Sequence, residues 1–189
     1  LVQGVMQRML DQIYEGKFCD FSYGFRTGRS CHHAIREVNQ IIMTKKINYV
    51  VDADIEGFFD NVDHDWMMKF LEHDIADKNF LRYIKRFLKA GVMEDMQYSE
   101  SDLGTPQGGL ISPVLANVYL HYVLDLWFDK VWTKQCKGEA YMVRYADDFV
   151  CMFQYENEAK RFFRELELRL GKFNLKLAKD KSRIFRFGR

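Results

Sequence analysis

The strongest constraint on the fold is a pair of adjacent carboxylates between two β-prone runs, in the segment MVRYADDFVCMF at residues 142–153. β-Branched and aromatic residues favour strands, and a tight turn tolerates Asp. The pattern predicts strand, turn and strand over Tyr141–Tyr155, with Asp147 and Asp148 at the turn. Two adjacent carboxylates repel each other, so a divalent cation at the turn would account for both acids. A solvated surface turn accounts for them as well.

A second acidic segment, YVVDADIEGFFDNVDHD at residues 49–65, predicts a strand over Asn48–Ile55. Alternate side chains of a strand share one face, so Asp52 and Asp54 point the same way among apolar neighbours. A carboxylate in an apolar strand is costly unless it is paired or binds a metal. The alternative is an edge strand with a polar outer face. Acids from this strand and from the hairpin together can hold two Mg²⁺ ions about 4 Å apart, as in polymerases and nucleases.

The rest of the chain predicts helices packed on a small antiparallel sheet, an α+β fold. Apolar spacing of the helical period supports several helices, and Ser112 and Pro113 form a helix start in which Ser caps and Pro occupies the first turn. Helices are predicted over 4–15, 34–44, 63–70, 78–90, 112–132 and 156–173, a loop over 21–29, a hairpin over 92–103, and short strands near Leu175 and Ile184.

Composition excludes several classes of protein. The 189 residues are 48% hydrophobic and 29% charged, and no apolar run is long enough to span a bilayer. Four cysteines without zinc-ligand spacing indicate reduced thiols in a reducing compartment. The net charge is only +1, but seven basic side chains lie in the last 18 residues, opposed by Asp180 alone. Because the chain begins at Leu1 and ends in a basic run, we expect it to be a piece of a longer protein.

Five motifs in order resemble those of reverse transcriptases. YADD at 145–148 resembles the polymerase motif C, and DIEGFFD at 54–60 resembles motif A. GTPQGGLISPVLANVYL at 104–120 resembles the palm motif with the Pro-Gln-Gly signature. SYGFRTGRSCHHAI at 22–35 and LKLAKDKSRI at 175–184 resemble the blocks before and after these. The SYGFR and FFDNVDHDWM segments are more similar to group II intron proteins than to retroviral enzymes.

The resemblance implies the palm of a right-handed polymerase, an antiparallel sheet packed by helices, with part of the fingers. Residues 48–63 and 104–189 would be the palm core. Residues 1–47 and 64–103 would be helices and loops of the fingers and palm. The family's first fingers block, which grips the triphosphate, and its thumb would lie outside this chain. We therefore expect the fragment alone to be weak or inactive.

The resemblance also implies the catalytic residues. Asp54, Asp147 and Asp148 correspond to the catalytic metal ligands, and the backbone of Ile55 would assist them. Asp147 would be the firmer ligand of the turn pair. Asp52 is a local competitor of Asp54, but the spacing to the paired Phe residues favours Asp54.

Nucleotide and template contacts follow from the same motifs. Phe59 falls where the family places its steric gate against a ribose 2′-hydroxyl, although an ordinary core aromatic is the alternative. Gln107 corresponds to a contact with the incoming nucleotide, and Lys181 to a lysine near its phosphates, with Lys179 as a neighbouring alternative. Template or other RNA contacts are expected at Arg26, Arg29 and Gly108, although solvated loop charges explain the arginines equally well.

The function implied is RNA-directed DNA synthesis by a group II intron-encoded maturase. Expected partners are intron RNA, an RNA template, a DNA primer or target, deoxynucleoside triphosphates and two Mg²⁺ ions, with Mn²⁺ as a substitute. We expect a cytoplasmic bacterial protein, associated with the nucleoid or a ribonucleoprotein, with no membrane partner and with self-association as a homodimer. The alternatives are an RNA-binding splicing scaffold with little polymerase activity, or another bacterial reverse transcriptase of the retron-like, diversity-generating or CRISPR-linked kind. Phe59 and YADD disfavour an RNA-dependent RNA polymerase.

Overall fold

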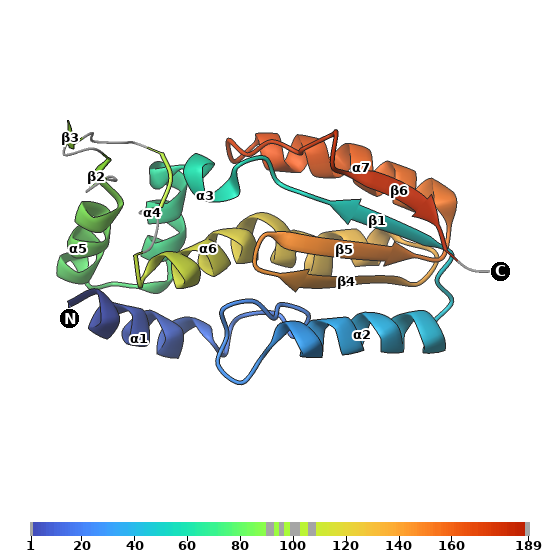
Figure 1. Cartoon of the computed structure of the whole chain (residues 1–189), viewed down its shortest axis with the longest axis horizontal. Coiled ribbons are helices and arrows are strands. Elements are labelled where there is room, and N and C mark those ends of the chain that lie inside the picture. Colours follow the sequence, from blue (N-terminus) through green and yellow to red (C-terminus); the bar gives the residue numbers. More distant parts are fainter. Residues whose placement is uncertain (1, 90–92, 95–96, 99–102, 106–108, 188–189) are drawn as a thin grey trace.

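A four-stranded antiparallel sheet forms the centre of the computed structural model, which describes residues 2–89, 93–94, 97–98, 103–105 and 109–187. The strand order is β4 (Ala140–Tyr145), β5 (Asp148–Phe153), β1 (Tyr49–Ala53), β6 (Arg183–Arg186). The predicted hairpin is β4–β5, in which Tyr145 pairs with Asp148 across a two-residue turn. Ala53 pairs with Phe149, so the end of β1 lies beside the start of β5. Both acidic segments therefore meet at one end of the sheet (Figure 1).

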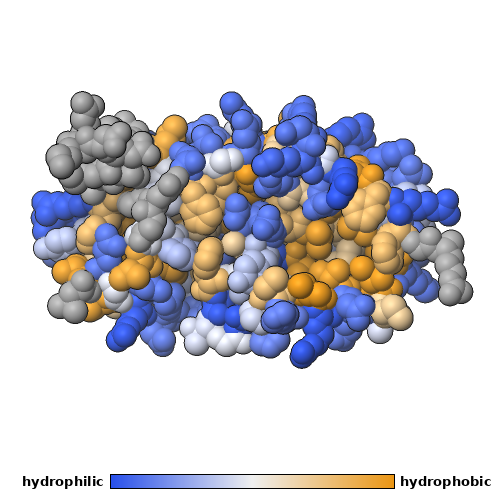
Figure 2. Space-filling model, in the orientation of Figure 1, coloured by the Kyte–Doolittle hydropathy of each residue, from blue (hydrophilic) through white to orange (hydrophobic). Residues whose placement is uncertain are grey.

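Helices cover both faces of this sheet. On one face, α6 (Ser112–Leu120) and α7 (Glu156–Gly171) pack with the strands into the main core. On the other face, α2 (Cys31–Thr44) packs beside β4 and joins a smaller apolar cluster that includes Val50, Val143 and Met152. In Figure 2, apolar side chains face the viewer over the strands and α2, with polar side chains along the outer edges.

The helix predicted from residue 112 continues as expected but changes its winding. After α6 come two π-helical segments, His121–Asp125 and Phe128–Trp132, and then a short 3₁₀ turn, Thr133–Gln135. Pro113 occupies the first turn as predicted, but Ser112 is the first helical residue and Ile111 precedes it. The prediction that Ser112 caps the helix is therefore wrong by one position, a common shift because helix ends are weakly specified by local sequence.

Most of the remaining elements agree with the pattern of apolar residues, but the short helix Phe58–Asn61 was not predicted. The remaining elements are α1 (Val2–Tyr14), α3 (Phe58–Asn61), α4 (His64–Asp74), α5 (Lys78–Lys89) and the hairpin of β2 (Met93–Glu94) and β3 (Gln97–Tyr98). The Asp63 side chain caps α4 by accepting from the Trp66 amide at 2.9 Å. The strand expected near Leu175 is reduced to an isolated bridge between Ile55 and Leu177. Among the described residues no helix is long and apolar enough to cross a bilayer. All four cysteines are free, as predicted.

Candidate active site

An open cleft of about 410 Å³ lies where the two acidic segments meet. Asp52, Asp54 and Asp148 line it together with apolar residues of β4, β5 and α2. Asp52 and Asp54 thus share one face, as the alternation along β1 predicts. The cleft combines an apolar wall with carboxylates at one end, so a bound molecule would meet both kinds of surface.

The acids at this end of the sheet influence one another. The pKa of the Asp148 carboxyl is raised from its ordinary 3.8, first by burial and then by the negative charges of Asp147, Asp54 and Asp52. Within the described part of the chain, no hydrogen bond or ion pair reaches the side chain of Asp147 or Asp148. Like charges held close without a neutralising partner favour a bound cation.

Two basic side chains stand at the outer rim of these acids. The Lys181 ammonium lies 3.5 Å from the Asp54 carboxylate, and the Arg183 guanidinium lies 3.6 Å from that of Asp52. Both basic side chains are about 70% exposed. The alternative lysine, Lys179, instead pairs with Glu167 of α7 at 2.6 Å. Lys181 is therefore the lysine that the structure brings to the acidic cleft.

The donor set fits a hard divalent cation in its chemistry. Carboxylate oxygens are the ligands that Mg²⁺ prefers. The backbone carbonyl of Asp54 accepts from the Ala178 amide at 2.9 Å, whereas that of Ile55 has no hydrogen bond among the described residues. In the described part of the chain, however, no three Asp, Glu, His or Cys side chains converge closely enough to enclose an ion on their own.

Comparison with known protein families decides what kind of chain this is. Residues 1–187 match the family model described as reverse transcriptase (RNA-dependent DNA polymerase). The chain belongs to the reverse transcriptase family. The resemblance found in the five motifs is therefore confirmed, and it extends over nearly the whole chain.

Relatives of this reverse transcriptase chain include proteins of group II introns. The group II intron-encoded protein LtrA of Lactococcus lactis subsp. cremoris is 42% identical over 130 residues, which cover 67% of this chain and 21% of LtrA. Protein YkfC of Escherichia coli K12 is 32% identical over 220 aligned positions, covering 97% of this chain and 56% of YkfC. The chain thus spans about a fifth of LtrA and little more than half of YkfC.

Solved structures show the same fold at low identity. A telomerase from Candida albicans, in complex with a fragment of telomeric RNA, superposes with a TM-score of 0.68 and 14% identity. The match covers 97% of this chain and 33% of the telomerase chain. This likeness confirms the fold predicted from the sequence, a palm-type α+β arrangement with an antiparallel sheet.

The expected sugar gate of this reverse transcriptase chain, Phe59, lies in α3 and is partly buried. Its ring packs edge-on against Phe58 at 5.3 Å and against Phe25 at 6.5 Å between ring centres. Its carbonyl accepts from the Thr105 amide at 2.8 Å, which ties α3 to the chain just before the Pro-Gln-Gly motif. Gln107 and Gly108, expected to contact nucleotide and template, lie outside the described residues. Phe25, which the structure places against Phe59, was not predicted, although an aromatic in the FRTGR loop is a usable sequence signal.

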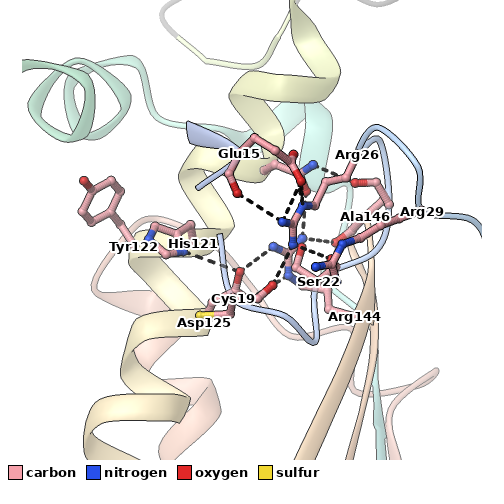
Figure 3. Close-up of polar contacts among 12 residues, drawn as sticks. Glu15, Cys19, Ser22, Arg26, Arg29, His121, Tyr122, Asp125, Arg144 and Ala146 are labelled. Carbon is pink, nitrogen blue, oxygen red and sulfur yellow. Dashed lines mark hydrogen bonds and ion pairs between the residues drawn. The ribbon is translucent and has the colours of Figure 1, made fainter. Parts of the chain in front are cut away.

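The two loop arginines have different surroundings. Arg26 is buried, and its guanidinium donates to the Glu15 carboxylate and to the carbonyls of Cys19 and Ser22 (Figure 3). Its position does not support the predicted template contact, because all three nitrogens of the guanidinium already donate hydrogen bonds within the protein. Arg29 pairs with the fully exposed Asp20 at 3.0 Å and keeps 23% of its side chain exposed, so it can still reach a nucleic acid.

A buried polar network behind the turn was missed by sequence reasoning. Arg144 of β4 is fully buried and pairs with Asp125 of the first π-helical segment (Figure 3). A charged residue inside the apolar run MVRY is the same kind of signal that drew attention to Asp52 in β1. The sequence alone gives no partner for it, because Asp125 lies on a distant helical segment.

Proposed function

We propose that the protein carrying this chain is an RNA-directed DNA polymerase of the group II intron-encoded type. The observation that carries the proposal is the gathering of carboxylates from β1 and from the β4–β5 turn at one end of the sheet. Membership of the reverse transcriptase family supports the reaction, and relatives named as group II intron proteins support the type.

In this proposal Asp54, Asp147 and Asp148 hold two Mg²⁺ ions, with the Ile55 carbonyl as a further ligand and Mn²⁺ as a substitute. The bound ions would activate the primer 3′-hydroxyl and stabilise the leaving pyrophosphate. The chain's own contribution is to bring these acids from β1 and from the β4–β5 turn to one end of the sheet, where Asp54 and Asp148 line one cleft. Lys181 lies 3.5 Å from the Asp54 carboxylate. In this proposal it leaves that carboxylate and pairs with the phosphates of an incoming nucleotide.

Sugar and base are recognised by neighbouring parts of the chain in this proposal. Phe59 excludes the 2′-hydroxyl of a ribonucleotide, so deoxynucleoside triphosphates are selected. Gln107 contacts the incoming nucleotide, and Arg29 and Gly108 contact template or other RNA. The DNA primer would end in the cleft, beside the acids.

The wider role proposed is that of a maturase that binds intron RNA, aids its splicing and primes DNA synthesis at a DNA target. Residues 48–63 and 104–189 would act as the palm core, with 1–47 and 64–103 contributing helices and loops of the fingers and palm. We place the protein in the bacterial cytoplasm, associated with the nucleoid or a ribonucleoprotein, and propose that it self-associates as a homodimer.

The test is primer extension by the full-length protein that carries this sequence, on an RNA template with a DNA primer, deoxynucleotides and Mg²⁺. Asp54→Asn and Asp147→Asn should each abolish extension, because each removes a ligand charge without changing side-chain volume. RNA affinity should be retained in both, since phosphate contacts come mostly from Lys and Arg. Asp129→Asn, which changes an acid paired with Lys130 away from the cleft, is the matched control and should extend normally.

Two results would count against the proposal. Wild-type extension by both Asp54→Asn and Asp147→Asn would refute the assigned metal ligands. A wild-type protein that binds intron RNA and promotes splicing, yet extends no primer under any template condition, would instead identify a splicing scaffold.

A further inference from the structure

The buried pair of Arg144 and Asp125 lies directly behind the acidic turn. The Nε and Nη2 atoms of Arg144 donate to the two carboxylate oxygens of Asp125 at 2.8 and 2.5 Å. Both side chains are fully buried. Taking two charges out of water is costly, and a buried ion pair is therefore weak evidence for stability alone. Fixing local geometry is a second role that such a pair can have.

The remaining arm of Arg144 reaches the turn itself. Its Nη1 atom donates to the Ala146 carbonyl at 2.7 Å and to the Asn117 side-chain oxygen at 3.0 Å. The Asn117 amide in turn donates to the Gly24 carbonyl at 2.7 Å. One planar guanidinium thus connects a π-helical segment, α6 and the turn, an arrangement that a lysine ammonium cannot reproduce.

The bond to the Ala146 carbonyl matters because of where that carbonyl lies. It belongs to the peptide unit that joins Ala146 to Asp147, and a peptide unit is planar. Ala146 has a φ of +58°, which is unfavourable for a residue with a Cβ and is kept only when the surroundings impose it. Holding this carbonyl therefore fixes the orientation of the peptide plane from which Asp147 starts.

The SYGFR loop also packs against the turn. A Cβ at Gly24 would lie only 2.2 Å from the Ala146 nitrogen, so the two backbones are in direct contact. The Tyr23 amide donates to the Arg144 carbonyl at 2.8 Å, and the Arg144 amide donates to the Phe21 carbonyl at 2.9 Å. The turn is thus in contact both with the backbone of the SYGFR loop and with the guanidinium.

We propose that Arg144, held by Asp125, is a positioning residue that orients the Ala146–Asp147 peptide and thereby sets the Asp147 carboxylate for metal binding. The proposal rests on the function proposed above, in which Asp147 is a metal ligand. Arg144 touches no reacting atom in it. Its effect reaches the metal through one hydrogen bond to the turn, as an outer residue orients a ligand.

A matched control exists in the same region. Arg169 of α7 donates to the carbonyls of Val123 at 2.8 Å and Tyr122 at 3.0 Å, in the same π-helical segment that carries Asp125. Arg169 has no contact with the turn among its described hydrogen bonds. Replacing Arg169 removes two hydrogen bonds to the same helical segment but leaves the Arg144–Asp125 pair and the bond to the Ala146 carbonyl unchanged.

The experiment compares Arg144→Lys, Asp125→Asn and Arg169→Lys in the full-length protein. Two quantities are measured: Mn²⁺ binding without nucleic acid, from the spin-resonance signal of the free ion, and the Mg²⁺ dependence of primer extension. Arg144→Lys and Asp125→Asn should bind Mn²⁺ about 10- to 100-fold more weakly, the range typical for loss of a residue that orients a ligand. They should lower kcat with little change in the KM for deoxynucleotide. Arg169→Lys should lower the unfolding temperature but leave Mn²⁺ binding unchanged.

The outcomes separate this inference from the proposed function. Wild-type Mn²⁺ affinity in Arg144→Lys, with loss of affinity in Asp147→Asn, would overturn the positioning role alone. Wild-type Mn²⁺ affinity in Asp147→Asn would overturn the ligand assignment of the proposed function. Should Arg144→Lys fail to fold, the double variant Asp125→Leu, Arg144→Met replaces the pair without burying a charge. Normal Mn²⁺ binding by that double variant would refute the positioning role equally.

Discussion

The ion pairs behind the acidic turn and those in front of it differ in their exposure to water. Behind it, Asp125 and Arg144 are fully buried and make two parallel hydrogen bonds. In front of it, Lys181 lies 3.5 Å from Asp54, and the basic side chain is 69% exposed. The buried pair of Asp125 and Arg144, the rear pair, is shielded from water and held by two hydrogen bonds. The pair of Asp54 and Lys181, the front pair, is solvated, and its charged atoms lie farther apart.

This difference indicates two separate tasks. Breaking a buried pair by removing one partner leaves an uncompensated charge, which costs about 3–5 kcal/mol. An exposed pair contributes only about 0–1 kcal/mol and is weakened by salt. The rear pair is therefore suited to holding the turn. The front pair is suited to exchange, because a metal ion or a phosphate can replace it at little cost.

The largest effect should come from breaking the rear pair outright. Asp125→Ala leaves Arg144 buried without its partner and should lower the free energy of unfolding by about 3–5 kcal/mol. Arg183→Ala, which breaks the exposed pair with Asp52, should change it by about 0–1 kcal/mol. Urea unfolding at neutral pH measures both. Equal losses of unfolding free energy in the two variants would show that burial does not determine how much these ion pairs contribute to stability.

A smaller loss is expected where the SYGFR loop meets the turn. Gly24→Ala places a Cβ 2.2 Å from the Ala146 backbone nitrogen, so one backbone must shift, and such overpacking costs about 1–3 kcal/mol. Gly16→Ala is the control, because a Cβ there meets nothing within 4 Å. The two variants are compared by thermal unfolding. If Gly24→Ala unfolds at the wild-type temperature, the loop does not support the turn.

The strands and the acidic cleft could be predicted because their signals are local. Alternation along β1 places Asp52 and Asp54 on one face, and turn chemistry places the Asp147–Asp148 pair at the hairpin. That the two acidic segments meet was a hypothesis from their chemistry, because alternation does not specify which strands pair; in the structure β1 pairs with β5. Lys181 was assigned by family resemblance, and the structure brings it to Asp54.

The arginines could not be assigned from the sequence because their partners are distant or irregular. Arg26 belongs to a motif-rich loop, yet it is buried by Glu15, eleven residues earlier. Arg144 depends on Asp125, which lies in a π-helical segment. A period of 3.6 residues does not describe that segment, so helical spacing misplaces the side chains beyond His121. Burial of these charges is a tertiary property that no local pattern carries.

A moderate effect on sugar selectivity should come from the SYGFR loop, where it contacts Phe59. Phe25 has a φ of +57°, is 49% exposed and packs edge-on against Phe59. Phe59→Val should admit ribonucleotides if Phe59 is the gate. Phe25→Ala should admit them less, because an aromatic pair contributes only about 0.5–1.5 kcal/mol. Competition between ribo- and deoxynucleotides in primer extension measures both. A Phe25→Ala enzyme with unchanged selectivity would restrict Phe25 to a surface role.

The smallest effect should come from a titratable group on the buried side. Burial lowers the pKa of His121 below its ordinary 6.5; Asp125 and Asp74 act to raise it, whereas Arg144 and Lys17 act to lower it. Its Nδ1 atom lies 3.9 Å from the Asp125 carboxylate and has no hydrogen bond. The folded chain therefore binds a proton here less readily than the unfolded chain does.

The sign of the pH dependence follows from linkage. Well above pH 6.5 the imidazole is neutral in both states, so it adds no pH dependence there. As pH falls below 6.5 the unfolded chain takes up the proton first, so stability should decline.

His121→Phe keeps the ring contacts with Phe18 and Tyr122 and removes the proton site. The variant should therefore lose less stability than wild type between pH 7.5 and 5.5 in urea unfolding. The pKa of the Asp74 carboxyl is lowered from its ordinary 3.8, so this group titrates below the pH range of the experiment. Identical pH profiles for wild type and His121→Phe would show that proton uptake at His121 does not distinguish the folded from the unfolded chain.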